Sequence, residues 1–295
     1  MNTGPFSRVF LARFFLFGAA IIWGSSFFMV KGVVDHLPPA TLLAVRFSIG
    51  TLILALIFQK KLKGLRRRDL VQGGIMGMWL AAGSLVQGIG ILDTTPGKNA
   101  FLTGIYCVIV PFLFWASGGK RPPLRSFLAA FLCLLGIGLV SLTETLRIGK
   151  GDLLTLISGF LFAVHIVSVA RRGEGMDPIA LCILQFASTA LFCWIYALIV
   201  EGNPFAFDWR PVWKPVLYLA LGPTTLAFLF QMMGLRLSTP SAASLILSLE
   251  SVFGVLFSAL FYGERMTFRL VLGFSVIFAA VLISEYRPRE REVAS

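Results

Sequence analysis

Three ionisable side chains lie alone inside long apolar runs of the sequence. They are Arg46, His165 and Glu250. A charged group in apolar surroundings is costly, so such residues usually mark a path for a substrate or an ion. A guanidinium can hold a carboxylate by two parallel hydrogen bonds, an imidazole can exchange a proton near neutral pH, and a carboxylate can bind an ammonium group or carry a proton. These three residues are therefore the first candidates for a substrate-binding site.

Each of the three residues also has a structural interpretation, which the sequence leaves open. Arg46 can extend its head group to a membrane surface or hold two parts of the chain together. A lone His on an apolar helix, such as His165, is more often a satisfied core residue. Glu250 can be a structural or gating carboxylate that is neutralised by Arg46 or by hydrogen bonds.

Neutral polar and aromatic residues complete the predicted substrate-binding site. They are Trp23, Ser25, Trp79, Gln87, Phe101, Tyr106 and Gln231. Amides offer both donors and acceptors, and aromatic rings stack on a ligand or attract a cation. The alternatives are hydrogen bonding between helices for the glutamines and packing or lipid contact for the rings. We predict no catalytic residue, no metal ligand and no cofactor, and we expect Lys98 to be a vestibule or lipid-facing cation.

The composition identifies the environment that must position these groups. Of the 295 residues, 57% are hydrophobic and 14% are charged, against about 25% charged in an ordinary soluble domain. The mean hydropathy is +0.85. This excludes a soluble globular protein, a disordered chain and a disulfide scaffold. The net charge of +12 does not indicate a nucleic-acid partner, because the basic residues lie between apolar runs, where they face lipid headgroups.

The apolar runs predict a polytopic all-α membrane protein. A bilayer core of about 30 Å needs about 20 helical residues. Ten such runs occur, at residues 13–33, 39–58, 70–91, 98–117, 124–143, 152–171, 178–200, 213–234, 240–262 and 267–285. If the N-terminus is cytoplasmic, seventeen of the 26 Lys and Arg residues lie in segments on that side, eight lie on the other side, and Arg46 lies within a span. This excess predicts that both termini are cytoplasmic.

An internal repeat relates the two halves of the chain. Residues 87–108 align without a gap with residues 231–252, at an offset of 144. The matched positions are Gln87 with Gln231, Gly90 with Gly234, Thr95 with Thr239, Pro96 with Pro240, and Tyr106 with Glu250. Residues 39–47 likewise align with residues 178–186, at an offset of 139.

The repeat predicts two five-helix units, residues 1–145 and 146–295. Because five is odd, the two units must enter the membrane from opposite sides. This inverted arrangement is typical of secondary transporters, whose substrate site lies near the midplane where the halves meet. We expect spans 1, 3, 4, 6, 8 and 9 to line the path. Spans 5 and 10 carry no ionisable residue in their centres and are expected to form an outer scaffold or a dimer face.

Four segments resemble the EamA-type members of the drug/metabolite transporter superfamily. They are IIWGSSF (21–27), PATLLAVRF (39–47), NAFLTGIYCVIVP (99–111) and AASLILSLESVFGVLFSALFYGE (242–264). Ser251 stands where the family pattern usually has Pro. The resemblance covers nearly the whole chain. It implies a ten-helix inner-membrane carrier, often an exporter of amino acids or other small metabolites.

We therefore expect a secondary transporter that exports a small polar or amphipathic metabolite, such as an amino acid, by alternating access. The expected partners are this small-molecule substrate and the lipid bilayer; proton coupling, and a monomer or a homodimer, stay open. One alternative is a flippase for a lipid-linked substrate. Another is an intramembrane enzyme, which the sequence disfavours because its two histidines form no HExxH motif and no nucleophile elbow occurs.

Overall fold

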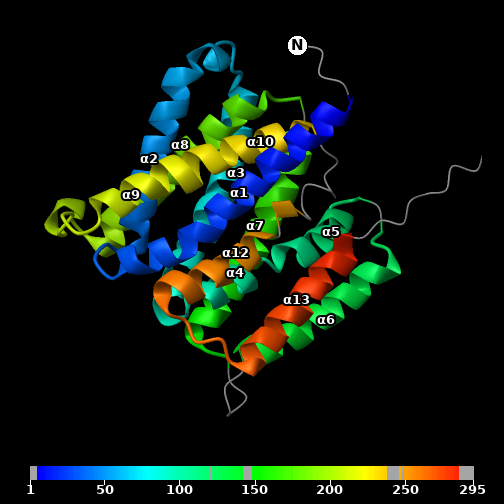
Figure 1. Ribbon diagram of the computed structural model, residues 1–295. Helices are drawn as coiled ribbons and strands as arrows, with labels where there is room; N and C mark the ends of the chain where they lie inside the picture. Colours follow the sequence, from blue (N-terminus) through cyan, green and yellow to red (C-terminus); the bar gives the residue numbers. More distant parts are fainter. Residues whose placement is uncertain are drawn as a thin grey trace, which may run out of the picture.

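The computed structural model describes residues 5–119, 121–141, 148–173, 175–237, 246–247 and 249–285. Helices account for the regular structure of the first half (Figure 1): α1 (Pro5–Val34), α2 (Pro39–Ile57), α3 (Arg67–Gly90), α4 (Pro96–Thr103), α5 (Tyr106–Ala116) and α6 (Leu124–Ser141). The second half contains α7 (Lys150–Arg172), α8 (Pro178–Tyr196), α9 (Trp213–Leu219), α10 (Ala227–Leu237), α12 (Leu249–Phe257) and α13 (Phe268–Glu285).

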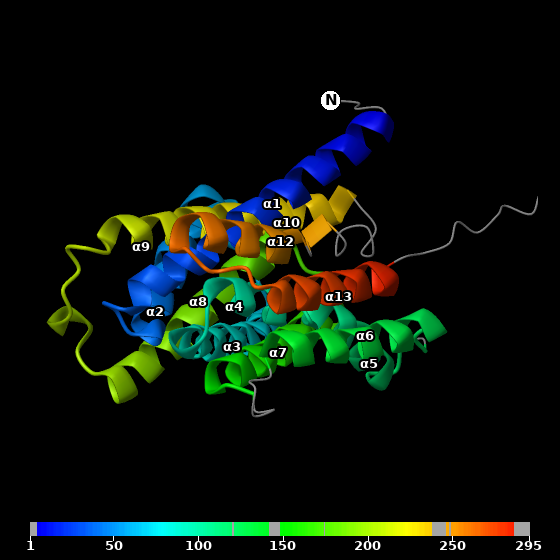
Figure 2. The ribbon, with the colours of Figure 1, turned by 60° about the horizontal axis from the view of Figure 1, so that its bottom comes forward.

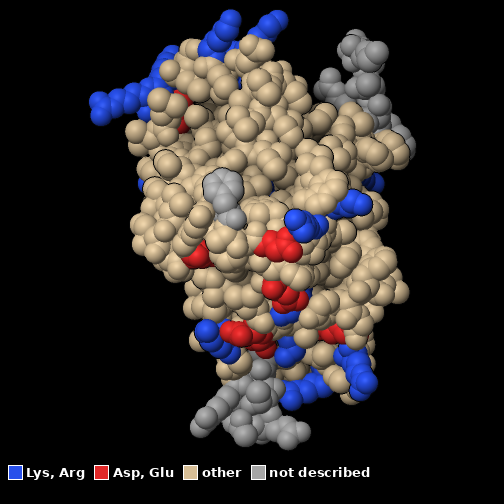
Figure 3. All heavy atoms as spheres, turned by 90° about the vertical axis from the view of Figure 1, so that its left-hand side faces the viewer, with Lys and Arg blue, Asp and Glu red and all other residues tan. Residues whose placement is uncertain are grey.

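The helices agree with the predicted membrane spans. In the described part of the chain, seven helices are long and apolar enough to cross a bilayer, and three shorter apolar helices cover 124–140, 249–262 and 268–283. The predicted ninth span begins at 240, and its first residues lie outside the described ones. Figure 3 shows a broad, largely uncharged band between basic side chains at the top and mixed acidic and basic side chains in the lower half. The chain is therefore an all-α polytopic membrane protein, as predicted.

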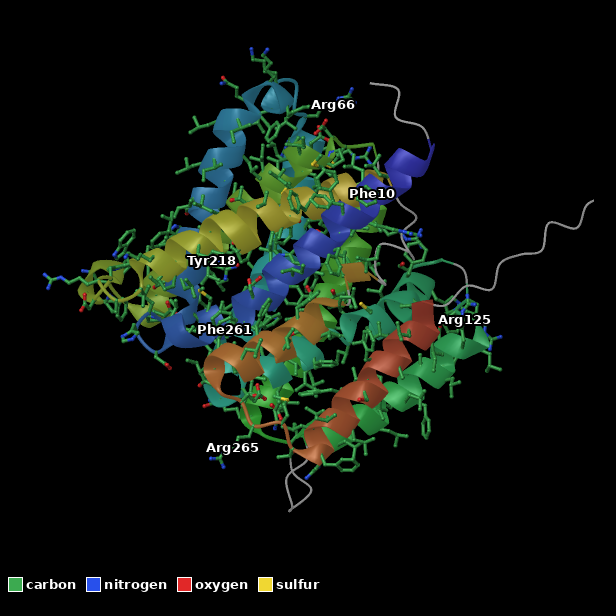
Figure 4. The ribbon with its side chains drawn as sticks, in the orientation of Figure 1. Phe10, Arg66, Arg125, Tyr218, Phe261 and Arg265 are labelled. Atoms are coloured by element: carbon green, nitrogen blue, oxygen red, sulfur yellow. The ribbon has the colours of Figure 1, made fainter. Side chains whose placement is uncertain are left out.

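The equivalent helices α6 and α13 make the inversion of the two halves visible. They lie side by side in both ribbon views (Figures 1 and 2). Arg125, at the start of α6, and Arg265, just before α13, lie at opposite ends of this pair (Figure 4). The two helices therefore run in opposite directions. Below, the end of the molecule that carries Arg66 and Arg125 is called the N-terminal end, and the end that carries Arg265 is called the opposite end.

Carboxylates of the second half cap helices of the first half at the opposite end. Glu201 accepts hydrogen bonds from the backbone N–H groups of Ala40 and Thr41, both at 2.8 Å. Glu264 accepts from the Gly97 N–H at 2.9 Å and from the Thr95 hydroxyl. Since the first N–H groups of a helix have no partner inside it, these caps remove a cost that would be large in a bilayer. They also tie α2 and α4 to the other half of the molecule.

At the N-terminal end, Asp177 connects the halves in a similar way. It caps α8 by accepting from the N–H groups of Ile179 and Ala180, and it forms an ion pair with Lys61 at 2.8 Å. Partial burial acts to raise the pKa of Asp177, but the hydrogen bonds from Lys61, Ala180 and Ile179 outweigh it and hold the pKa below its ordinary value. This cap is consequently most effective above the ordinary aspartate pKa.

Glycines in α3 allow this helix to approach α8 closely. A Cβ atom at Gly77 would lie 2.4 Å from the Ser188 Cβ and 2.5 Å from the Gln185 carbonyl oxygen. The Thr189 hydroxyl donates to the Gly77 carbonyl at 3.0 Å across the same contact. One turn earlier, a Cβ at Gly74 would meet only the Ser188 hydroxyl, at 3.7 Å. Gly77 is therefore required for the contact, whereas Gly74 is not.

The variant Gly77→Ala is expected to destabilise the protein, because its Cβ would push the backbone of α8 away. Overpacking of this kind costs about 1–3 kcal/mol. Thermal unfolding of purified protein in detergent measures the effect as a fall in melting temperature. The matched control, Gly74→Ala, makes the same change where space exists, and should melt at or slightly above the wild-type temperature. Equal melting temperatures for the two variants would contradict the packing argument.

Candidate functional site

A cavity of about 240 Å³ lies between the two halves. Its walls come from α1, α2, α3, α4 and α5 of the first half and from α7, α8, α10 and α12 of the second. Residues of α6 and α13 do not line it, which matches the expectation for spans 5 and 10. The expectation for the lining spans was incomplete, because spans 2 and 7 contribute Arg46 and Gln185 as well.

Seven of the ten predicted site residues line this cavity. They are Trp23, Arg46, Gln87, Tyr106, His165, Gln231 and Glu250. They come from helices far apart in the sequence, and the fold collects them around one space.

The other three predicted residues lie outside the cavity lining. The Ser25 hydroxyl forms a hydrogen bond of 2.6 Å with the Tyr218 hydroxyl, where α1 meets α9. Phe101 is buried and stacks on Phe274 of α13, with ring centroids 4.4 Å apart. Trp79, on α3, is only partly buried. Residue type suggested these three, but the direction that each faces follows from helix packing.

Glu250 is bound by the residue that the repeat pairs with it. The Tyr106 hydroxyl donates to Glu250 Oε1 at 2.8 Å, and these residues are equivalent at the offset of 144. Glu250 is 7% exposed. Among the described residues no ion pair joins it to Arg46, so of the two structural roles considered for Glu250, hydrogen bonding is the one present.

A second contact joins equivalent residues of the two repeats. Phe47 and Phe186, related by the offset of 139, pack edge to face with centroids 5.2 Å apart. A residue can touch its own repeat partner only near the axis that relates the repeats. The pseudo-twofold axis therefore passes close to both this pair and Tyr106–Glu250. Because Phe47, Tyr106 and Glu250 line the cavity, the cavity lies on the axis.

A π-helical segment between α9 and α10, Ala220–Leu226, positions two residues of the first half. It contains Pro223, which has no backbone N–H to donate within the helix. The Trp23 indole N–H donates to the Pro223 carbonyl at 2.9 Å, and Arg46 Nε donates to the Thr224 hydroxyl at 3.2 Å. In the described part of the chain, Arg46 has no carboxylate partner. Its terminal N–H groups are therefore available to donate to an acceptor in the cavity.

Two other predicted site residues are held by hydrogen bonds within the protein. His165 Nε2 and the Gln185 amide oxygen lie 2.9 Å apart, and both side chains are buried. His165 is thus a satisfied buried residue that also lines the cavity. Gln87 Nε2 donates to the Thr103 hydroxyl at 2.9 Å. Gln231 has no side-chain hydrogen bond to any residue that the structure describes.

The cavity also includes polar residues that are not among the ten predicted site residues. They are Ser26, Ser84, Asn99, Thr103 and Gln185. Gln185 could have been found, because the repeat pairs it with Arg46 at the offset of 139. The others carry no comparable signal, since polar side chains of this kind are common at helix contacts.

Lys98 lies outside the cavity lining and pairs with a carboxylate. Its Nζ is 3.3 Å from Asp152 Oδ2, and the Thr94 hydroxyl donates to the other oxygen of Asp152. This contact joins α4 to α7 at the opposite end. Lys98 therefore serves here as a tie between the halves, and the vestibule role predicted for it stays a prediction. Among the described residues, no three His, Cys, Asp or Glu side chains are grouped to hold a metal ion.

The variant Tyr106→Phe is expected to destabilise the protein, because it leaves Glu250 buried without its hydrogen-bond donor. An unsatisfied buried group costs about 1–3 kcal/mol. Thermal unfolding in detergent measures the change. Tyr262→Phe is the matched control, since Tyr262 is 44% exposed, and it should leave the melting temperature nearly unchanged. A Tyr106→Phe protein as stable as this control would show that the bond contributes nothing.

Comparison with known proteins identifies the family. The model of the EamA-like transporter family matches the chain twice, at residues 10–142 and at residues 149–286. An uncharacterized transporter of Archaeoglobus fulgidus is 28% identical over 275 residues, which cover 91% of this chain and 83% of that protein. The uncharacterized transporter YoaV of Bacillus subtilis is 22% identical over 288 residues, which cover 94% and 98% of the two chains.

A solved structure has the same fold. It superposes with a TM-score of 0.66 over 92% of this chain and 96% of that chain, at 16% sequence identity. At this low identity the likeness supports the architecture alone.

Proposed function

The chain belongs to the EamA-like transporter family, and we propose that it exports a small polar or amphipathic metabolite by alternating access. The first substrate that we propose is an amino acid. The twofold match to the family and the relatives named as transporters support a membrane transporter and give no indication of an enzyme.

The observation that carries the substrate proposal is the pair of opposite charges in one cavity. Arg46 offers unpaired N–H groups of a guanidinium, and Glu250 has one carboxylate oxygen bonded by Tyr106. A free amino acid carries a carboxylate and an ammonium group. Arg46 would take the carboxylate by parallel hydrogen bonds, and Glu250 would face the ammonium group. The aromatic rings that also line the cavity, such as Trp23 and Phe228, suit the apolar part of an amphipathic solute.

The position of the cavity on the pseudo-twofold axis supports alternating access. When two inverted repeats exchange their conformations, a site on the axis is kept while access passes from one membrane face to the other. In a contact between equivalent residues, such as Tyr106–Glu250 or Phe47–Phe186, this exchange only swaps the two partners, so the same contact is formed in both states. We propose that these contacts persist in both states and that the halves move around them.

We propose that the protein lies in the inner or plasma membrane with both termini in the cytoplasm. The excess of Lys and Arg on the N-terminal side supports this orientation. We place the boundary between the repeats at residues 145 and 146, which lie between the two matched family segments. Export then means that the substrate enters the cavity from the N-terminal end.

Transport of amino acids by purified protein in liposomes tests the proposal. Wild-type protein should move at least one radiolabelled amino acid above the background of empty vesicles. Arg46→Gln should weaken binding of that amino acid by about tenfold or more, because a hydrogen bond to a charged group contributes about 1.5–3 kcal/mol. Competition by unlabelled substrate measures this. If wild-type protein transports no amino acid, the proposed substrate is wrong. If Arg46→Gln binds the amino acid as tightly as wild-type protein does, Arg46 does not bind the substrate carboxylate.

A proton-coupled mechanism makes a separate prediction for Glu250. If this carboxyl carries the proton, Glu250→Gln should abolish transport driven by a pH gradient, because an amide cannot release a proton. Exchange of substrate across vesicles without a gradient should continue. Both rates are measured on the same liposomes, with wild-type protein as the control. If transport driven by a pH gradient persists in the variant, Glu250 is not the group that carries the proton.

A further inference from the structure

The repeat places glutamines at equivalent positions, but the two have different surroundings. Gln87 and Gln231 both line the cavity and are related by the offset of 144. Gln87 donates to the Thr103 hydroxyl at 2.9 Å. Position 103 corresponds to Leu247 in the second repeat, and a leucine cannot accept a hydrogen bond. Among the described residues, the amide of Gln231 accordingly has no partner.

Leu247 is buried in an apolar cluster that includes residues of both α1 and α10. Leu247 is 6% exposed and shares this cluster with Leu16, Ala19 and Ala227, and Phe230 packs against it. Ala227 and Phe230 lie on α10, four residues and one residue before Gln231. Where the first repeat has a hydroxyl that bonds its glutamine, the second thus has a buried apolar side chain at the equivalent position. The repeats therefore differ at the position of Thr103 and Leu247 and not in the glutamine itself.

The same division occurs at another equivalent pair. Gln185 is held by His165 at 2.9 Å, whereas its repeat partner Arg46 bonds only the Thr224 hydroxyl among the described residues. In each pair one member is tied to a neighbour within the protein, and the other keeps donors for the cavity. An unpaired amide inside a bilayer protein costs free energy unless a ligand or water bonds it.

We infer that Gln231 contacts the substrate directly and that Gln87 is a positioning residue that acts through Thr103. This inference rests on the proposed transport function, and it names the amide that recognises the solute beside Arg46. An amide offers one acceptor and two N–H donors without adding charge. The recognised group is therefore a polar, hydrogen-bonding part of the solute, such as its ammonium group.

Gln231 lies six residues before the end of α10 at the N-terminal end, whereas Gln87 lies three residues before the end of α3 at the opposite end. The recognising amide thus lies toward the face from which an exported solute enters.

The test compares matched variants of the two glutamines in liposomes, with the amino acid that wild-type protein transports. Gln231→Leu should raise the KM by about three- to tenfold with little change in the maximal rate, as expected for one lost hydrogen bond to the solute. Gln87→Leu removes the same amide at the equivalent position and should raise the KM less. A KM raised equally in the two variants, or unchanged in Gln231→Leu, would overturn the inference.

A second variant tests the cause without removing the amide. Leu247→Thr gives Gln231 the hydroxyl that Thr103 gives to Gln87, so the amide should turn away from the solute and the KM should rise about threefold. In the Gln231→Leu background the same change should have no effect on the KM. An equal effect in both backgrounds would mean that Leu247→Thr disturbs packing, and would overturn the inference.

These outcomes are distinct from a failure of the proposed substrate. If wild-type protein transports no amino acid, the proposed substrate is wrong. A thermal-shift screen of wild-type protein against a panel of metabolites then supplies the probe, since a bound ligand raises the melting temperature. Wild-type protein, Gln231→Leu and Gln87→Leu are then compared by titration with that probe. Gln231→Leu must weaken its binding more than Gln87→Leu, or the inference fails independently.

Discussion

A polar group in the bilayer interior has no bulk water to bond, so it needs a partner in the protein or in a ligand. Most described polar groups near the cavity obey this constraint by bonding one another across helices. Tyr106 bonds Glu250, Gln87 bonds Thr103, and His165 is paired with Gln185. These pairs hold the helices together, and they also make the few unpaired groups informative. In a soluble protein, water would satisfy such groups and the distinction would be lost.

The inverted repeat determines where the cavity lies. Two rigid copies of one five-helix unit can meet around an axis only if their equivalent surfaces complement each other. The contacts Phe47–Phe186 and Tyr106–Glu250 show how this is achieved. The aromatic pair uses the same residue twice, because an edge-to-face contact needs only a rotation between identical rings. The polar pair needs a donor and an acceptor, so the repeat has diverged there to a hydroxyl and a carboxylate.

The sequence was sufficient to predict the architecture but only part of the site. The ten apolar runs and the offset of 144 predicted the helices and their inversion, because span length and periodicity follow from the bilayer itself. Residue type singled out Arg46 and Glu250, and both line the cavity. It could not predict that Phe101 packs against α13 or that Ser25 bonds Tyr218, since a rotation of a helix by one residue changes which side chain faces inward. The π-helical segment that places Thr224 against Arg46 also depends on packing and not on a motif.

Sequence divergence between the repeats makes the polarity of the cavity different toward its two membrane faces. Two identical inverted repeats would build a site with equal polarity toward both membrane faces. At the offset of 139, Arg46 corresponds to Gln185, and Ser26 corresponds to His165; all four line the cavity. The first repeat thus contributes a permanent cation where the second contributes a neutral amide, and Glu250 adds a carboxylate from the second repeat. A solute that carries both signs of charge would bind such a site in one orientation, because reversing it would place each charged group opposite the wrong half. In the proposed mechanism, the symmetric frame allows movement between two states, and the asymmetric side chains recognise the solute.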